Sequence, residues 1–138
     1  MKIVAISIKN KNGDLLELDK AYLIEGKGLE DDKNAKGGQR QISLLPLKVR
    51  SMINKGDVEG LCIRRYMENL TYSGDALTKG GIYKIGEARI QVTRENKKCF
   101  PECKNIIDNL YCPLVENATF AKIIKSGNIR LNDVIEPL

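Results

Sequence analysis

The sequence predicts a mainly β domain, a closed or partly open β-barrel with a few short helices. Apolar and polar residues alternate in several short segments, turn residues separate these segments, and few segments have helical spacing. The chain has 138 residues, which suits one domain spanning residues 1–138. At this length about two-thirds of the unfolded surface can become buried, so we expect a core that needs no disulfide or metal.

The first half of the chain predicts strands, one long loop and one helix. Lys2–Lys9 alternates with the period of a half-buried strand, and Lys11–Asp14 has the composition of a turn. Gly26–Gln39 is polar and rich in glycine, which predicts a long loop of the kind that often carries function. Further short strands are predicted at Leu15–Leu18, Ala21–Ile24 and Arg40–Leu45.

Pro46–Lys55 is predicted to be a helix. Pro46 suits its first position, because a proline there sacrifices no hydrogen bond. Leu47, Met52 and Ile53 are expected to form its apolar face, and Gly56 to end it.

The second half predicts hairpins and a short helix. Cys62–Leu70 has a mixed pattern that we interpret as a strand entering a turn. Ile82–Arg94 predicts a hairpin that turns at Gly86-Glu87, and Pro101–Asn109 predicts a short helix. A last pair of neighbouring strands is predicted at Phe120–Ile124 and Ile129–Ile135.

The amino-acid composition limits the classes of function that the chain can have. The formal net charge is +5, yet the charges are scattered and the chain has no Trp, two Phe and five Tyr, so base stacking on nucleic acid is not expected. There is no histidine, which excludes the commonest general base and zinc ligand. No apolar run is long enough to span a membrane, and the N-terminal residues do not resemble a signal peptide. We therefore expect a cytoplasmic protein with reduced thiols.

The four cysteines are the residues that most strongly indicate a chemical function. They are Cys62, Cys99, Cys103 and Cys112. Lys97 and Lys98 precede Cys99, and a helix that begins near Pro101 would place Cys99 at its N-terminal end. Both features favour the thiolate, the form that attacks sulfur and binds metals. Cys103, four residues later, is expected within reach of Cys99.

Three interpretations of these cysteines stay open at this stage. Cys99 carries sulfur as a persulfide or donates to a metal cofactor, with Cys103 assisting. Alternatively, the cysteines bind zinc or an iron–sulfur cluster, although their spacing is not that of a usual zinc knuckle. Alternatively, they are buried structural thiols, which is how we interpret Cys62 between two apolar neighbours.

Two further segments carry candidate binding residues. The glycine-rich loop combines Asp32 with Arg40, whose guanidinium suits a phosphate, although a plain surface loop is the stronger alternative. Glu68 and Asn69 belong to a dense polar run that either satisfies a turn or lies at the rim of the same pocket.

Taken together and in order, these segments resemble the MOSC domain, named for the C-terminal domain of molybdenum-cofactor sulfurase, in its short stand-alone bacterial form. The resemblance covers nearly the whole chain. It rests on Arg40-Gln41-Ile42-Ser43-Leu44-Leu45, on Tyr66 before Glu68-Asn69-Leu70-Thr71, on Ile85-Gly86-Glu87, on Cys99 and Cys103, on Cys112, and on Phe120-Ala121-Lys122-Ile123.

The resemblance implies a β-barrel of the MOSC or pyruvate-kinase type and a role as sulfur carrier. In this role a cysteine takes sulfur from a pyridoxal-dependent cysteine desulfurase, or works with a molybdoenzyme-maturation protein, and passes the sulfur to a molybdenum cofactor or another metal–sulfur centre. Some relatives bind that cofactor, a phosphorylated pterin. The residues that match family positions are Cys99 and Cys103 for sulfur, and Arg40, Asp32, Glu68, Asn69 and Cys112 for the pocket.

The chain also departs from the family pattern. Two positions where the family has histidine hold Asn34 and Gln39. A pocket without histidine loses proton-transfer and metal-binding groups. The alternative function is therefore a non-catalytic binding module for a metal ion or a phosphorylated pterin, in a degenerate family member, and a third is a barrel kept for protein contacts.

Overall fold

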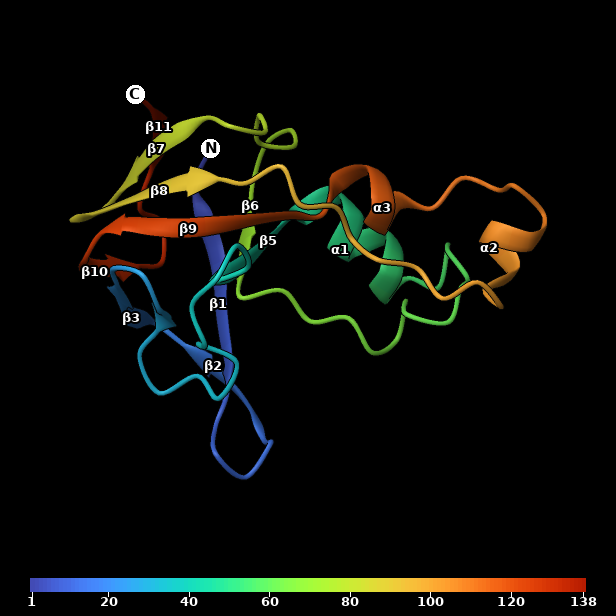
Figure 1. Cartoon of the computed structure of the whole chain (residues 1–138), viewed down its shortest axis with the longest axis horizontal. Helices are drawn as coiled ribbons and strands as arrows, with labels where there is room; N and C mark the ends of the chain where they lie inside the picture. Colours follow the sequence, from blue (N-terminus) through green and yellow to red (C-terminus); the bar gives the residue numbers. More distant parts are fainter.

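A strongly curled sheet of eight strands dominates the computed structural model, which describes residues 1–138 (Figure 1). In spatial order its strands are β11 (Ile135–Pro137), β7 (Ile82–Ile85), β8 (Ala88–Val92), β9 (Thr119–Lys125), β5 (Ile42–Pro46), β6 (Leu70–Tyr72), β1 (Ile3–Lys9) and β2 (Leu15–Leu18). A second sheet contains β10 (Gly127–Arg130), β3 (Lys20–Ile24) and β4 (Gly28–Leu29). The predicted mainly β, barrel-like fold is confirmed.

The two ends of the chain meet along one seam of this barrel. The Ile3 N–H donates to the Asp133 carbonyl at 3.0 Å, and the Ile135 N–H donates to the Met1 carbonyl at 2.8 Å. Lys2 and Val134 form an antiparallel bridge between these bonds. Because β11 also pairs with β7, this seam links one end of the large sheet back to β1.

Alternation of side chains builds the core inside the barrel. In β8, Ala88, Ile90 and Val92 are buried while Arg89 is exposed, as the period of two requires. One cluster of 19 buried residues fills the barrel. A separate cluster of five buried residues lies outside it, under the helices: Leu45, Val49, Ile63, Leu114 and Ala118.

Helix α1 (Leu47–Asn54) follows β5 directly. Pro46 is its N-cap, one position before the place we predicted, and the helix ends before Gly56, which has φ +76°. The predicted apolar face is wrong in part, because Val49 is the buried residue and Leu47 is exposed. Because β5 is paired in the sheet, the direction in which α1 leaves the barrel is fixed, and this direction decides which face of α1 is buried. The sequence of the helix alone does not show which face that is.

Two sequence predictions in the second half are corrected by the structure. Segment 62–69 is a run of turns and bends without a strand, and the strand begins only at Leu70. Strands β9 and β10 do not pair with each other: β9 lies between β5 and β8, whereas β10 pairs with β3. The short turn after Lys125 takes the chain from one sheet to the other, a topology that local patterns do not encode.

The region after β8 holds two short helices where we predicted one. Helix α2 (Lys104–Ile107) starts three residues later than Pro101, with Cys103 as its N-cap. Helix α3 (Pro113–Asn117) was not predicted from the sequence. Figure 1 shows α2 far from the barrel, at the right-hand end of the molecule. None of the helices is both long and apolar enough for a membrane span.

Candidate functional site

All four cysteines line one small cavity beside the second core cluster. Cys62 comes from the turns before β6, Cys99 from the segment after β8, and Cys103 and Cys112 immediately precede α2 and α3. The walls are mostly apolar, and the cavity measures about 20 Å³. A space of this size holds roughly one water-sized group. None of the four cysteines forms a disulfide. We call this cavity the thiol pocket.

Cys103 lies deepest among these thiols. Its residue is 7% exposed, and the backbone N–H groups of Leu61 and then Asn105 lower the pKa of its thiol, while burial opposes the shift. Gly60 permits this arrangement, since a Cβ there would lie 2.9 Å from the Asn105 amide nitrogen and 3.7 Å from the Cys103 sulfur. The Asn105 amide in turn donates to the Glu59 carbonyl at 2.7 Å.

Cys99 is half-buried, and its environment differs from our expectation. Burial raises the pKa of its thiol, and the neighbouring thiols, first that of Cys112, raise it further; Lys97 offsets part of the rise. The expected placement of Cys99 at a helix N-terminus is wrong, because the helix begins at Lys104. Cys103 therefore has the more readily ionised thiol and Cys99 the more accessible one.

Two cations lie near Tyr66. Lys97 lies over the Tyr66 ring, with its nitrogen 5.8 Å from the ring centroid, and it also lines the thiol pocket. Arg40 stacks on Phe120 at 4.4 Å and donates to the Asn96 carbonyl at 2.6 Å. Neither cation is part of an ion pair in this structure.

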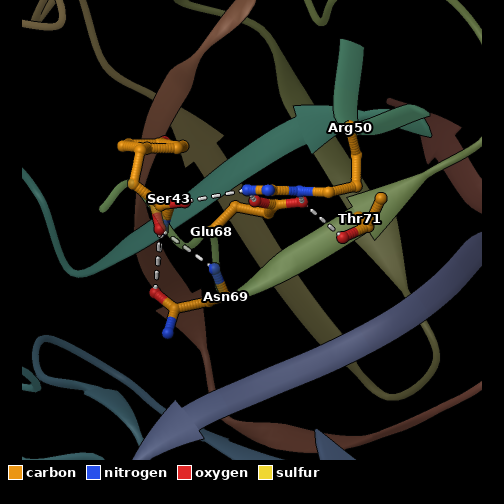
Figure 2. A network of polar contacts seen from close by, with 6 residues as sticks. Ser43, Arg50, Glu68, Asn69 and Thr71 are labelled. Atoms are coloured by element: carbon orange, nitrogen blue, oxygen red, sulfur yellow. Dashed lines mark hydrogen bonds and ion pairs between the residues drawn. The ribbon is translucent and has the colours of Figure 1, made fainter. Parts of the chain in front are cut away.

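A second group of predicted residues forms a polar network between β5, α1 and β6 (Figure 2). Glu68 accepts hydrogen bonds from Arg50, one of them from Nε at 3.1 Å, and from the Thr71 hydroxyl at 2.6 Å. Several hydrogen bonds join Asn69 and Ser43. Among them, the Asn69 N–H donates to the Ser43 hydroxyl and the Ser43 N–H donates to the Asn69 side-chain oxygen, both at 3.0 Å.

Asn69 extends this network to the glycine-rich loop. Its amide nitrogen donates to the Asp32 carboxylate and to the Ser7 carbonyl, both at 3.1 Å. Asp32 also accepts from the Lys9 N–H at 3.2 Å. Asp32, Glu68 and Asn69 line a polar cavity of about 110 Å³, and in the structure their polar groups bind to other parts of the chain.

The predicted site residues thus lie in three different parts of the structure. Cys99, Cys103 and Cys112 share the thiol pocket, which Cys62 joins although we interpreted it as a core residue. The other predicted residues lie elsewhere: Asp32, Glu68 and Asn69 at the polar cavity, and Arg40 beside Phe120. Sequence reasoning missed Arg50, which neutralises Glu68 from α1 and carries no local signal of its partner. Whether any of these residues acts on a ligand stays a prediction.

Both cavities are smaller than a usual site for a small-molecule cofactor. No group of three or more Cys, Asp or Glu side chains is arranged to hold a metal ion. Small-molecule sites usually measure about 300–1,000 Å³, and the thiol pocket and the polar cavity are far smaller. Binding of a phosphorylated pterin by the residues predicted for the cofactor stays a prediction.

Comparison with known proteins places the fold. No family model matches the chain, and no curated protein matches it. Among solved structures, YuaD of Bacillus subtilis is 18% identical with a TM-score of 0.68, covering 99% of this chain and 94% of its own. YiiM of Escherichia coli is 19% identical with a TM-score of 0.64, covering 100% and 70%. YiiM of Geobacillus stearothermophilus is 16% identical with a TM-score of 0.64, covering 99% and 74%. At these identities the likeness establishes the fold alone: this chain has the fold of YuaD and YiiM, in line with the MOSC-like fold expected from the sequence.

Proposed function

We propose that this chain is a MOSC-domain sulfur carrier, which takes sulfur onto a cysteine as a persulfide and passes it to a molybdenum cofactor or another metal–sulfur centre. The observation that carries the proposal is the convergence of four free thiols on a cavity the size of one small group. The terminal sulfur of a persulfide fits such a space, and the apolar walls shield it from water. The MOSC-like fold supports the same function.

Sulfur enters at Cys99, because this thiol is the more accessible. Its thiolate attacks the outer sulfur of a persulfide on the donor protein; a new S–S bond forms, the donor S–S bond breaks, and the donor cysteine leaves as thiolate. The Cys103 thiolate then attacks the outer sulfur on Cys99 and releases the Cys99 thiolate. Each step exchanges one thiolate for another, so neither consumes an oxidant or a reductant.

The two pKa shifts indicate which thiol is ionised when the second step begins. Backbone N–H groups favour the ionised form of Cys103, whereas burial and neighbouring thiols disfavour that of Cys99. At neutral pH a larger fraction of Cys103 is therefore ready to attack. Sulfur on Cys103 lies in the buried part of the pocket, where unspecific acceptors reach it less easily.

The test is to incubate the chain with a small persulfide, such as glutathione persulfide, and to map the added sulfur by mass spectrometry. We expect a gain of one sulfur atom on the Cys103 peptide, and on the Cys99 peptide in a Cys103→Ser variant. Cys62→Ser and Cys112→Ser are matched controls from the same pocket and should still load. A wild-type chain that gains no sulfur, or a Cys99→Ser/Cys103→Ser variant that loads normally, would contradict the proposal.

The alternative function, a binding module for a phosphorylated pterin, has one observation in its favour. An open groove of about 750 Å³ adjoins the thiol pocket at Gly60 and Leu61 and is lined by Lys55, Arg64 and Arg65. It has the size and charge that a phosphorylated ligand needs. Tight binding of a phosphorylated pterin, lost in an Arg64→Ala/Arg65→Ala variant and unaffected by Cys99→Ser/Cys103→Ser, would favour this module over the carrier.

A further inference from the structure

Large apolar side chains are exposed around the entrance of the thiol pocket. They belong to the segment from Phe100 to Tyr111 and to the turn before Cys62. These six residues, with their exposed fractions, are Leu61 (41%), Phe100 (49%), Ile106 (51%), Ile107 (67%), Leu110 (50%) and Tyr111 (66%). We call them the entrance patch.

The entrance patch is continuous with the wall of the thiol pocket. Leu61 and Phe100 line the pocket themselves. The Cys103 N–H donates to the Phe100 carbonyl at 3.0 Å, and the Leu110 N–H donates to the Asn105 carbonyl at 2.8 Å, so the segment folds back tightly around the thiol. Figure 1 shows that α2 stands away from the barrel. A concentration of exposed apolar side chains on one surface marks an interaction site, and aromatic residues such as Phe100 and Tyr111 are typical of binding hot spots.

The charges around the patch indicate what kind of surface covers it. Five cations lie on the same stretches, none of them in an ion pair: Arg64, Arg65, Lys97, Lys98 and Lys104. Three carboxylates accompany them, those of Glu59, Glu102 and Asp108. With five cations and three carboxylates, these stretches carry excess positive charge beside their exposed apolar side chains, so they complement a partner surface that is apolar and acidic.

We infer that the entrance patch is the docking surface for the protein that delivers sulfur, a persulfide-bearing protein whose own contact surface is apolar with an acidic border. This inference rests on the proposed function, because it identifies the occupant by the thiols beneath the patch. A second copy of this chain is a poorer occupant, since it would bring two positively charged surfaces together. An anionic membrane is also a poorer one, because α2 has only four residues and presents no amphipathic helix to a lipid surface.

The experiment compares a protein donor with a small donor. The donor protein is a cysteine desulfurase loaded with radioactive sulfur from cysteine, and the small donor is glutathione persulfide. The variant Ile107→Ser/Tyr111→Ser changes the two most exposed residues of the patch, and Leu15→Ser, at a residue 43% exposed on β2, is the matched control. We expect the variant to slow transfer from the desulfurase and weaken its binding by about tenfold or more, with loading from the small donor unchanged.

Each other outcome is informative. An equal loss with both donors would show that the variant damages the pocket, and no loss with either would show that donors do not dock there; both overturn the inference. Binding of the desulfurase without sulfur transfer to any cysteine would overturn the proposed function and leave the docking surface intact. Dimerisation of the chain, or sedimentation with phosphatidylserine vesicles, that the variant abolishes would assign the patch to a second copy or to a membrane instead.

Discussion

The ion pair between Arg50 and Glu68 offers the sharpest test of how the site is held together. The Glu68 side chain is 1% exposed and that of Arg50 is 13% exposed. Arg50 makes two hydrogen bonds to the Glu68 carboxylate and one to the Tyr66 carbonyl at 2.9 Å. Replacing Arg50 by leucine removes all three and leaves a buried carboxylate with Thr71 as its remaining partner.

The expected cost follows from this geometry. Removing one partner of a buried ion pair destabilises proteins by about 3–5 kcal/mol, because the remaining charge is buried without compensation. The total free energy of unfolding of a domain is usually only about 5–15 kcal/mol. Arg50→Leu should therefore lose a large share of the stability, seen as a lower midpoint of urea unfolding at neutral pH.

A double-variant cycle separates the charge from the loss of packing. Arg50→Leu/Glu68→Leu removes both charges, and apolar pairs often replace buried ion pairs at little cost, so we expect it to regain most of the lost stability. Lys48→Leu, which breaks the exposed pair with Asp75, is the control and should change the free energy of unfolding by less than about 1 kcal/mol. The reasoning would be refuted if Arg50→Leu cost no more than this control, or if the double variant were as unstable as the sum of the single ones.

Two further predictions concern stability at high pH and the wall of the thiol pocket. Burial raises the pKa of Tyr72 to about 12, whereas a tyrosine in the unfolded chain titrates near 10. Its contribution to stability is thus complete below about pH 10 and declines by at most about 3 kcal/mol as the pH rises to 12, so urea unfolding from pH 9 to 12 should show a steeper loss for wild type than for Tyr72→Phe. Gly60→Ala should push the Asn105 side chain away from Glu59 and slow sulfur loading of Cys103. Gly26→Ala, whose added Cβ meets no atom within 4 Å, serves as its control, and equal loading rates would argue against a role for the close approach at Gly60.

Local patterns in the sequence predicted the elements better than their arrangement. The strand at Lys2–Lys9 and the hairpin around Gly86-Glu87 are confirmed, because alternation and turn residues are encoded by neighbours. The predicted pairing of the last strands was wrong, because their partners β8, β5 and β3 lie far away in the sequence. The same limit applies to Cys62 in the thiol pocket and to Arg50 beside Glu68, which long-range folding brings together.

The closing of the barrel by the first and last strands has a consequence for biosynthesis. The N–H of Ile135 donates to the carbonyl of Met1, so the seam forms only after Ile135 has been synthesised and has left the ribosome. Pairings between such distant residues form slowly. Until then the first residues of the chain, Met1–Ile3, which β2 does not cover, keep one unpaired edge, the kind of surface on which incompletely folded chains aggregate. Protection of this edge by a chaperone until the seam has formed should therefore raise the yield of folded protein.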